Sequence, residues 1–530
     1  MNSYLSGQYM YLKTKSNPLL FSALWLLIGL LACQPSRHNA FDGVQPTEEF
    51  ALSGMTIDSM QHKLQSGELT SLAITQLYID RIRQFDRKGP ALHSVIQINP
   101  EALSIAIQMD DERKLNHIRG PLHGIPILIK DNIDTHDQMP NTAGSLAMID
   151  NHPQQDAFII KKLRDAGAII LGKTNLSEWA NFRSTQSISG WSSVGGQTKN
   201  PYVLDQTPCG SSSGSAVAVA ADFCMIAVGT ETDGSIACPA SFNAVVGIKP
   251  TVGLVSRSGI IPISRTQDIA GPMARTVRDA AILLGVMSGY DPNDETTLRC
   301  VERGVIDYTQ FLRYDGLKGK RIGIEKTMRH KHDQVGRLLE QAIALMEKQG
   351  ATIIEVQFAS LYDNVADAEF EVLQTEFKDG LNQYLANCGC PMQSIDDVIR
   401  YNMEHDSSVM PLFKQETMIA ASSKGGLDHP AYLDALSKTY ALKPLLDKLL
   451  NTYALDALCG VGSGAYSPAA VAGYPSITIP MGTANELPYG ITFFGRPFNE
   501  PGLLTIGYSY EQSSRKRTTP KYLSTNKSAF

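Results

Sequence analysis

Apolar and polar positions follow two different patterns along the 530-residue chain. Between residues 71 and 85 apolar side chains recur every three or four positions, which predicts one apolar face of a helix with Ser71 as its cap. Residues 155–166 and 274–288 show similar helical spacing. Short apolar runs typical of buried strands occupy residues 125–130, 168–173, 225–230 and 476–480.

Strand-type runs joined by helical segments predict an α/β fold, in which helices cover both faces of a mixed or parallel sheet. Residues 360–450 look mostly helical, and we interpret them as an elaboration of the same large domain. With 43% hydrophobic and 19% charged residues, the composition is that of a globular protein. Because the net charge is −6 and no basic run occurs, we expect no nucleic-acid partner.

The first 48 residues have the pattern of an export signal followed by a tether. Lys13 and Lys15 precede an apolar stretch over residues 19–32, which is too short to span a bilayer comfortably but suits a secretory signal. Ala32 before Cys33 resembles a bacterial lipoprotein cleavage site. The sequence therefore predicts a signal peptide (1–32), a tether (33–48), a single large domain (49–518) and a polar tail (519–530). An uncleaved anchor helix is the alternative.

By this resemblance Cys33 would carry the lipid, and its lipid anchor would be the protein's only membrane contact. Gln34 in place of Asp resembles lipoproteins that are sent to the outer membrane, so we expect a periplasmic protein of the bacterial envelope. Seven cysteines remain: Cys209, Cys224, Cys238, Cys300, Cys388, Cys390 and Cys459. An odd number leaves at least one free thiol. We expect most of them to be buried core residues, and Cys388 and Cys390 to be too close for an ordinary loop-closing bridge. No CxxC pair or HExxH motif indicates a metal site.

Three consecutive serines lie in "TPCGSSSGSAVAVA", residues 207–220. The segment lacks the lysine and glycine spacing of a phosphate-binding loop, and the buried helix predicted at residues 216–221 argues against a tether. A turn that lets a helix pack closely, without any chemistry, is one alternative. "GSSSG" also matches the nucleophile elbow, with Ser212 as nucleophile. That interpretation needs an acid and a histidine, and His332, His405 and His429 lie in no informative context.

A second serine and a lysine offer a different chemistry. Ser235 lies in "GTETDGSIACPAS", after the strand-type run 225–230, in a turn that would expose successive N–H groups to an oxyanion. Lys130 ends the apolar run "IPILIK". A lysine there is usually solvated, but burial would lower its pKa and leave a neutral amine able to act as a base. Two serines and such a lysine would form a proton relay without histidine.

Seven ordered segments resemble the amidase signature family. They are "GPLHGIPILIKDNID" (120–134), "LGKTNLSEWANF" (171–182), "GGQTKNPY" (195–202), "CGSSSGSAVAVA" (209–220), "GTETDGSIACPASFNAVVGIKPTVGL" (229–254), "GYPSITIPMG" (473–482) and "PYGITFFGRPFNEPGLL" (488–504). The resemblance covers residues 50–515 and implies the amidase signature fold and a Ser–Ser–Lys triad.

The triad implied by the resemblance has Lys130 as base and Ser235 as nucleophile. Ser211 would bridge them, held by a cis peptide bond after Gly210, with Ser212 in support and Ser213 as part of the turn. The backbone N–H groups of Thr232, Asp233, Gly234 and Ser235 would hold the oxyanion. No metal or organic cofactor is required. Lys173 would lie outside the relay as a structural lysine.

The chain departs from the common family pattern "GTDTGGSIR", because Glu231, Asp233 and Ala237 replace Asp, Gly and Arg. The variant resembles the peptide amidase branch, whose members release ammonia from C-terminal peptide amides. We hypothesise that the Asp233 carboxylate repels a substrate carboxylate by about 1–2 kcal/mol.

Other members of the family hydrolyse fatty-acid or aryl amides, and both remain alternatives. The tRNA amidotransferases of the family share the triad too, but their substrate is cytoplasmic and the export signal argues against them. From other classes, "SSRK" (513–516) fits the S-x-x-K of serine transpeptidases by letter but lacks a K-T-G partner. A non-catalytic periplasmic binding lipoprotein is the last alternative. A small-molecule or peptide amide is the expected partner, and the sequence says nothing of the oligomeric state.

Overall fold

The computed structural model describes residues 50–523 apart from residues 303 and 305. The predicted signal peptide, the tether and the lipidation site Cys33 therefore lie outside the described residues. Of the predicted C-terminal tail, residues 519–523 are described. They lie against the domain, where the backbone N–H of Leu204 donates to Leu523 O and that of Tyr522 to Pro201 O. No helix in residues 50–523, with their two gaps, is long and apolar enough to cross a membrane.

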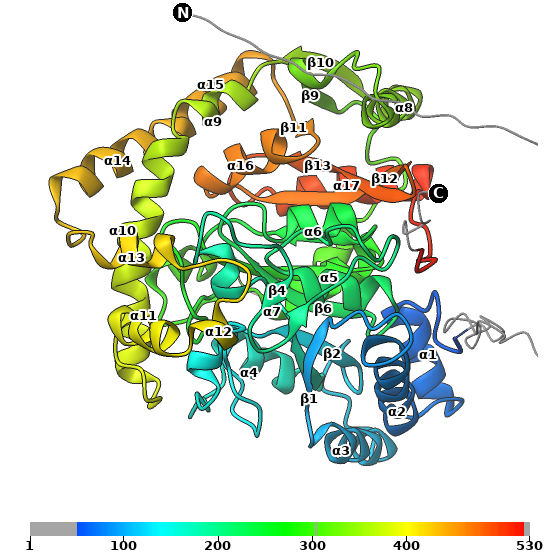
Figure 1. Ribbon diagram of the computed structural model, residues 1–530. Helices are drawn as coiled ribbons and strands as arrows, with labels where there is room; N and C mark the ends of the chain where they lie inside the picture. The colour runs from blue at the N-terminus through cyan, green and yellow to red at the C-terminus, as the bar shows by residue number, and fades with distance from the viewer. Residues whose placement is uncertain (1–49, 303, 305, 524–530) are drawn as a thin grey trace, which may run out of the picture. The chain divides into compact units, whose positions relative to one another are not determined.

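An 11-stranded mixed sheet forms the centre of the domain, with the strand order β1-β3-β2-β6-β8-β7-β12-β13-β11-β9-β10 (Figure 1). Parallel pairs lie near both ends of the sheet. Between them, antiparallel pairs join each strand to the next in the series β6, β8, β7, β12, β13 and β11. The strands are β1 (Val95–Ile98), β2 (Pro126–Lys130), β3 (Ile169–Thr174), β6 (Ile226–Glu231), β7 (Val246–Lys249), β8 (Ile269–Ala274), β9 (Arg321–Glu325), β10 (Thr352–Val356), β11 (Ala457–Gly460), β12 (Ser476–Ala484) and β13 (Leu487–Phe494).

Helices cover both faces of this sheet, as the sequence predicts (Figure 1). They are α1 (Ile57–Ser66), α2 (Ser71–Arg81), α3 (Ala102–Lys114), α4 (Phe158–Asp165), α5 (Ser213–Ala220), α6 (Ala237–Phe242), α7 (Val277–Met287), α8 (Gln334–Lys348), α16 (Ser463–Val471) and α17 (Glu500–Ser514). The strands β2, β3 and β6 are buried along their whole length. Their continuous apolar runs reflect this burial on two faces.

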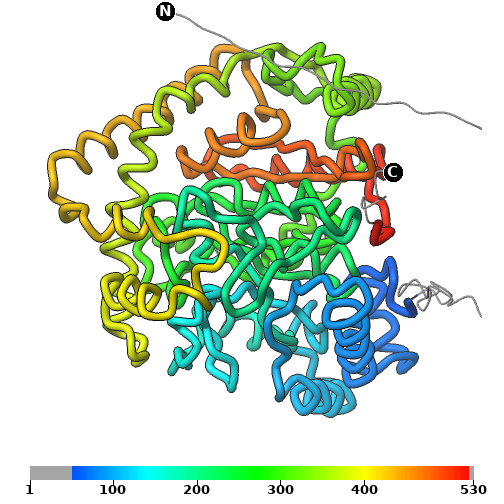
Figure 2. The backbone as a smooth tube through the Cα atoms, in the orientation of Figure 1, coloured from blue at the N-terminus to red at the C-terminus, as the bar shows by residue number. Residues whose placement is uncertain are grey.

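A helical elaboration separates β10 from β11 and runs along one side of the sheet (Figure 2). It comprises α9 (Ala359–Asp363), α10 (Ala366–Asn387), α11 (Ile395–Glu404), α12 (Asp406–Val409), α13 (Glu416–Ser422), α14 (Pro430–Tyr440) and α15 (Leu442–Thr452). Phe377 and Leu381 of α10 share a buried cluster with Trp179, Phe182 and Ile261 from loops of the sheet domain. The prediction of a helical elaboration over residues 360–450 is confirmed.

Two local predictions need correction. The cap of α2 is Thr70, whose hydroxyl accepts from the N–H of Ala73, because the helix begins at Ser71 and does not follow it. Ser213 is the first residue of α5, and its hydroxyl donates to Cys209 O at 2.5 Å, so it closes the loop onto the helix.

Candidate active site

Lys130 lies at the carboxyl end of β2 and is fully buried. Its Nζ is 2.8 Å from Ser211 Oγ, 3.0 Å from Ser212 Oγ and 2.8 Å from Thr230 Oγ1. Burial lowers its pKa from 10.5 to about 7, although the negative charges of Asp268 and Glu231 act against that shift. A substantial part of the amine is therefore neutral at neutral pH, and it can accept a proton from a neighbouring hydroxyl.

Ser211 and Ser212 precede α5 and are both fully buried. The Gly210–Ser211 peptide bond is cis, as the family resemblance implies. Ser212 Oγ donates to Thr230 O at 2.9 Å, and its backbone N–H donates to Ser235 O at 3.1 Å. Ser212 thus fastens the serine loop both to β6 and to the loop that carries Ser235.

Ser235 lies in the loop between β6 and α6, with 8% of its surface exposed. Within the described residues its hydroxyl has no hydrogen-bond partner, and none of the N–H groups of residues 232–235 donates to a protein acceptor. The next two N–H groups, of Ile236 and Ala237, both donate to Glu231 Oε2. The loop therefore presents free donors beside a free hydroxyl, the arrangement that an oxyanion requires.

Topology brings these groups together. β2 and β6 are parallel neighbours, so Lys130 and Thr230 lie at the same edge of the sheet. The amino end of α5, which carries the serines, faces that edge because Ser215 of α5 donates to Val228 O of β6. Sites at the carboxyl ends of parallel strands are common in α/β proteins.

Acidic side chains surround the loop of residues 232–235. Asp268 accepts from the Thr232 hydroxyl at 2.6 Å and from the N–H groups of Ile263 and Ser264. Its burial raises its pKa to about 6. Asp233 accepts from Ser467 at 2.8 Å, while Tyr362 donates to Glu369 at 2.9 Å. Burial, and then the charge of Glu369, raises the pKa of Asp233 well above its usual range.

This geometry corrects the hypothesis about Asp233. The sequence suggests an isolated carboxylate beside the nucleophile loop, but Asp233 shares a buried environment with Glu369. Burial raises the pKa values of both carboxyl groups. The effect of Asp233 on a substrate therefore has to be considered together with that of Glu369.

A disulfide joins Cys209 to Cys238, with the Cα atoms 5.8 Å apart. Cys388 and Cys390 are also paired, across Gly389 with its φ of 71°. This pairing across a single residue is not predicted by the sequence, in which the two cysteines lie too close for an ordinary loop-closing bridge. The prediction of buried core cysteines holds for Cys224, Cys300 and Cys459.

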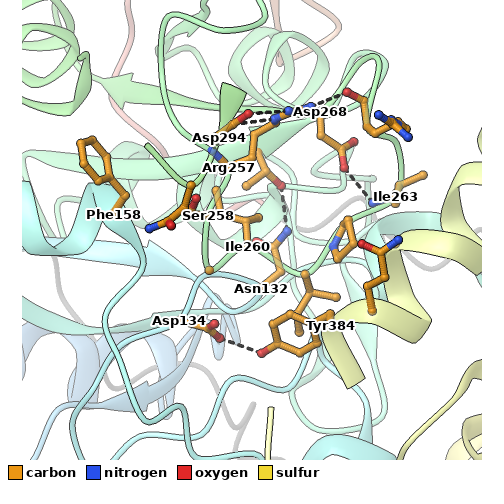
Figure 3. Close-up of a pocket in the computed structure, with 18 of the residues that line it drawn as sticks. Asn132, Asp134, Phe158, Arg257, Ser258, Ile260, Ile263, Asp268, Asp294 and Tyr384 are labelled. Carbon is orange, nitrogen blue, oxygen red and sulfur yellow. Dashed lines mark hydrogen bonds and ion pairs between the residues drawn. The ribbon is translucent and has the colours of Figure 1, made fainter. Parts of the chain in front are cut away.

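A cleft of about 1040 Å³ opens beside the site (Figure 3). Thr230, Thr232 and Asp268 line the cleft, and so does Tyr384 of α10, whose hydroxyl donates to Asp134 at 2.7 Å. Polar and apolar residues both contribute to the lining, and the cleft is large enough for a ligand of several residues, near the size usual for small-molecule and cofactor sites.

The sequence model of the family described as Amidase matches residues 73–460. The chain belongs to the amidase signature family. This amidase is 46% identical to a solved peptide amidase from Stenotrophomonas maltophilia, with a TM-score of 0.87 over 89% of this chain and 100% of that one. It is 41% identical to a probable amidase of Arabidopsis thaliana, over 91% of this chain and 94% of that protein.

A component of the glutamyl-tRNA(Gln) amidotransferase of Thermoanaerobacter pseudethanolicus is 32% identical over 89% of this chain and 98% of its own length. Together these relatives identify the protein as a hydrolase of carbon–nitrogen amide bonds, with the single large domain predicted.

The competing interpretations of the serines find no support in this amidase. His332, His405 and His429 are all exposed, and no hydrogen bond within the described residues joins any of them to Ser212. Lys173 is buried, and its Nζ donates to Ile133 O at 2.6 Å, as expected of a structural lysine. The "SSRK" segment spans the end of α17 and the residues that follow it.

Sequence reasoning missed several residues of the site. Thr230, which offers two oxygens to Lys130, is predicted only as part of a strand. Asp268, Tyr362 and Glu369 lie 33 to 134 residues from Ser235 along the chain, and no local pattern connects them. The Cys209–Cys238 bridge has a signal, since each cysteine lies within three residues of a candidate serine, but pairing cannot be read from spacing alone.

Proposed function

We propose that this amidase hydrolyses its substrate through a relay of Lys130, Ser211 and Ser235. The observation that carries the proposal is a fully buried lysine with a pKa of about 7, placed 2.8 Å from Ser211 Oγ. A neutral amine in contact with a serine is the arrangement that activates a hydroxyl without histidine.

In the proposed reaction, Lys130 takes the proton of Ser211 while Ser211 takes that of Ser235. Ser235 Oγ then bonds to the amide carbonyl carbon, and the N–H groups of residues 232–235 stabilise the negative oxygen. The C–N bond breaks as the proton on Lys130 returns through Ser211 to the leaving nitrogen. Water then enters, gives its proton to the same relay and releases the acid from Ser235. Every proton is accounted for without a metal or an organic cofactor.

For the substrate, we propose the C-terminal amide of a peptide, with ammonia as the leaving group. The 46% identity to peptide amidase supports this assignment, and another solved peptide amidase structure carries the competitive inhibitor chymostatin. The shared charge of the Asp233–Glu369 pair would repel the carboxylate of a free peptide and accept a neutral carboxamide. The cleft has room for the residues that precede the amide.

Fatty-acid and aryl amides are the competing substrate classes. The acidic and polar residues of the cleft, among them Asp134, Arg257 and Glu376, favour a peptide over a long acyl chain because an apolar chain would leave these groups without water. A panel of peptide amides, fatty amides and aryl amides, scored by amine or ammonia release, tests this order. Faster turnover of a fatty or aryl amide than of every peptide amide would overturn the peptide assignment.

A fluorophosphonate probe tests the nucleophile and separates an enzyme from a binding lipoprotein. We expect a single covalent adduct on Ser235, found by peptide mass spectrometry, and none in Ser235→Ala. Ser213→Ala serves as the matched control, since Ser213 directly follows Ser212 at the start of α5 and its hydroxyl donates to Cys209 O. An adduct on Ser212 would support the nucleophile elbow, and an unlabelled but folded protein would support a binding role.

We also propose export and lipid anchoring through Cys33. The support is the sequence pattern "LLAC" at residues 30–33, and the Cys209–Cys238 disulfide is consistent with an oxidising compartment. Mass spectrometry of the mature protein's first residue tests the proposal: a diacylglyceryl group on Cys33 supports it. A mature chain that retains residues 1–32 would contradict it.

A further inference from the structure

The Cys209–Cys238 disulfide lies between the two loops that carry the candidate serines. Cys209 directly precedes Gly210 and Ser211, and Cys238 lies in the first turn of α6, three residues after Ser235. We propose that this disulfide is a positioning element of the reaction, which holds the Ser235 loop against the Ser211 loop. The inference rests on the relay proposed above.

The two loops have separate origins in the fold: one enters α5 and the other joins β6 to α6. Noncovalent contacts also help to set their spacing, because Ser212 exchanges hydrogen bonds with Thr230 at the end of β6 and its N–H donates to Ser235 O at 3.1 Å. Asn243, which follows α6, donates from Nδ2 to Pro208 O at 2.8 Å. The disulfide is the covalent link between the two loops, and it lies beside the serines themselves.

The Ser235 loop needs such a restraint because its own backbone donors are left free. The N–H groups of residues 232–235 have no protein acceptor within the described chain, and the next two N–H groups are held by Glu231, which accepts from Ile236 and Ala237. Cys238 N–H donates to Gly234 O at 2.8 Å, so the disulfide acts directly on the segment that presents the donors. A displacement of ~1 Å in a reacting group can reduce a rate by about 100-fold.

The link also makes the site sensitive to redox conditions. A water-soluble phosphine breaks the S–S bond, is oxidised to the phosphine oxide with oxygen from water, and leaves two thiols at Cys209 and Cys238. Oxidation by a disulfide reagent reverses the change. The other pair, Cys388 and Cys390, lies at the end of α10 and joins neither serine loop, although Cys388 lines the cleft. Opening it therefore controls for the loss of a disulfide that does not restrain the serines.

The test compares full-length wild type with Cys209→Ser/Cys238→Ser and with the control Cys390→Ser. We expect the double variant to lose at least tenfold in kcat with less than a threefold change in KM, and the control to stay within twofold of wild type. Phosphine treatment of wild type should produce the same loss, reverse on reoxidation, and leave the double variant unaffected. Thiol titration in each sample reports how many bonds have opened.

The rate constant of fluorophosphonate labelling separates positioning from folding. If the disulfide only stabilised the fold, its loss would lower the fraction of the protein that becomes labelled. If the disulfide positions the serines, its loss lowers the rate constant at which each folded molecule is labelled. A wild type that keeps its kcat and labelling rate after Cys209 and Cys238 are titrated as thiols would overturn the inference, even if the double variant fails to fold. Absence of labelling and of ammonia release in oxidised wild type would instead overturn the relay itself.

Discussion

Burial of Lys130, which favours its neutral state, lowers the free energy of unfolding at neutral pH. Comparison with a Lys130→Met variant makes this effect measurable. At 1.36 kcal/mol per pKa unit, the difference between 10.5 and about 7 corresponds to ~5 kcal/mol. At pH 7 about half of the Lys130 side chains are neutral, whereas a lysine with an ordinary pKa would be neutral in only about one molecule in 3000. The mechanism depends on this difference.

The sign of the effect follows from proton binding. Between pH 7 and pH 10.5 the unfolded chain holds a proton on Lys130 that the folded chain has lost, so the stability of wild type rises with pH in this window. Below pH 7 Lys130 is protonated in both the folded and the unfolded chain, so its contribution to the free energy of unfolding no longer changes with pH. Lys130→Met lacks the group, and relative to it wild type should gain ~2–3 kcal/mol of unfolding free energy between pH 7 and pH 9.

Urea unfolding of both proteins at several pH values measures this gain. In parallel, kcat/KM of wild type should rise with pH through a midpoint near 7 and then level off, because only the neutral amine accepts a proton. Lys173→Met is the control: Lys173 is equally buried but contacts Ile133 O, so its loss should leave the midpoint unchanged. Parallel stability curves for wild type and Lys130→Met, or an activity midpoint above pH 9, would refute the reasoning.

Further substitutions test the surroundings of the relay. Gly234→Ala places a Cβ 2.4 Å from the Tyr466 ring at a φ of +73°; we expect at least a tenfold loss of kcat, against no loss in Gly54→Ala, where φ is +69° and nothing lies within 4 Å. Asp268→Asn removes a negative charge that supports protonated Lys130, so the midpoint of the activity profile should move to lower pH, and an upward move would contradict this. Glu231→Ala leaves the N–H groups of Ile236 and Ala237 without their acceptor; the unfolding free energy should fall by ~2–4 kcal/mol, measured by denaturant titration, while an unchanged value would show that water replaces the carboxylate. Asp233→Asn should narrow the preference for peptide amides over free peptides in competition assays. An unchanged preference would show that the Asp233–Glu369 pair does not determine this specificity.

Local sequence patterns predicted the parts of the fold in which each strand is buried along its length. The runs at 125–130, 168–173 and 225–230 became β2, β3 and β6 because parallel strands buried on both faces are apolar throughout. Strands such as β9 and β10, which lie at one end of the sheet and expose some residues, gave no comparable signal. Their place in the sheet depends on tertiary packing.

The candidate site likewise contains some residues that the sequence predicts and others that it does not. Lys130, Ser211 and Ser235 lie in short conspicuous motifs, and the family resemblance assigns each a role. Tyr362 and Glu369 come from the helical elaboration, where the sequence carries only helical spacing. Their contact with Asp233 arises because α9 and α10 fold back toward the β6–α6 loop. The export signal and Cys33 stay predictions.

α10 belongs to the helical stretch of chain between β10 and β11, and its residues Glu376 and Tyr384 line the cleft. Other lining residues, such as Asn132 and Arg257, come from the same part of the chain as Lys130 and Ser235. A change in α10 would therefore alter one part of the ligand-binding surface, while the reactive groups keep their native scaffold.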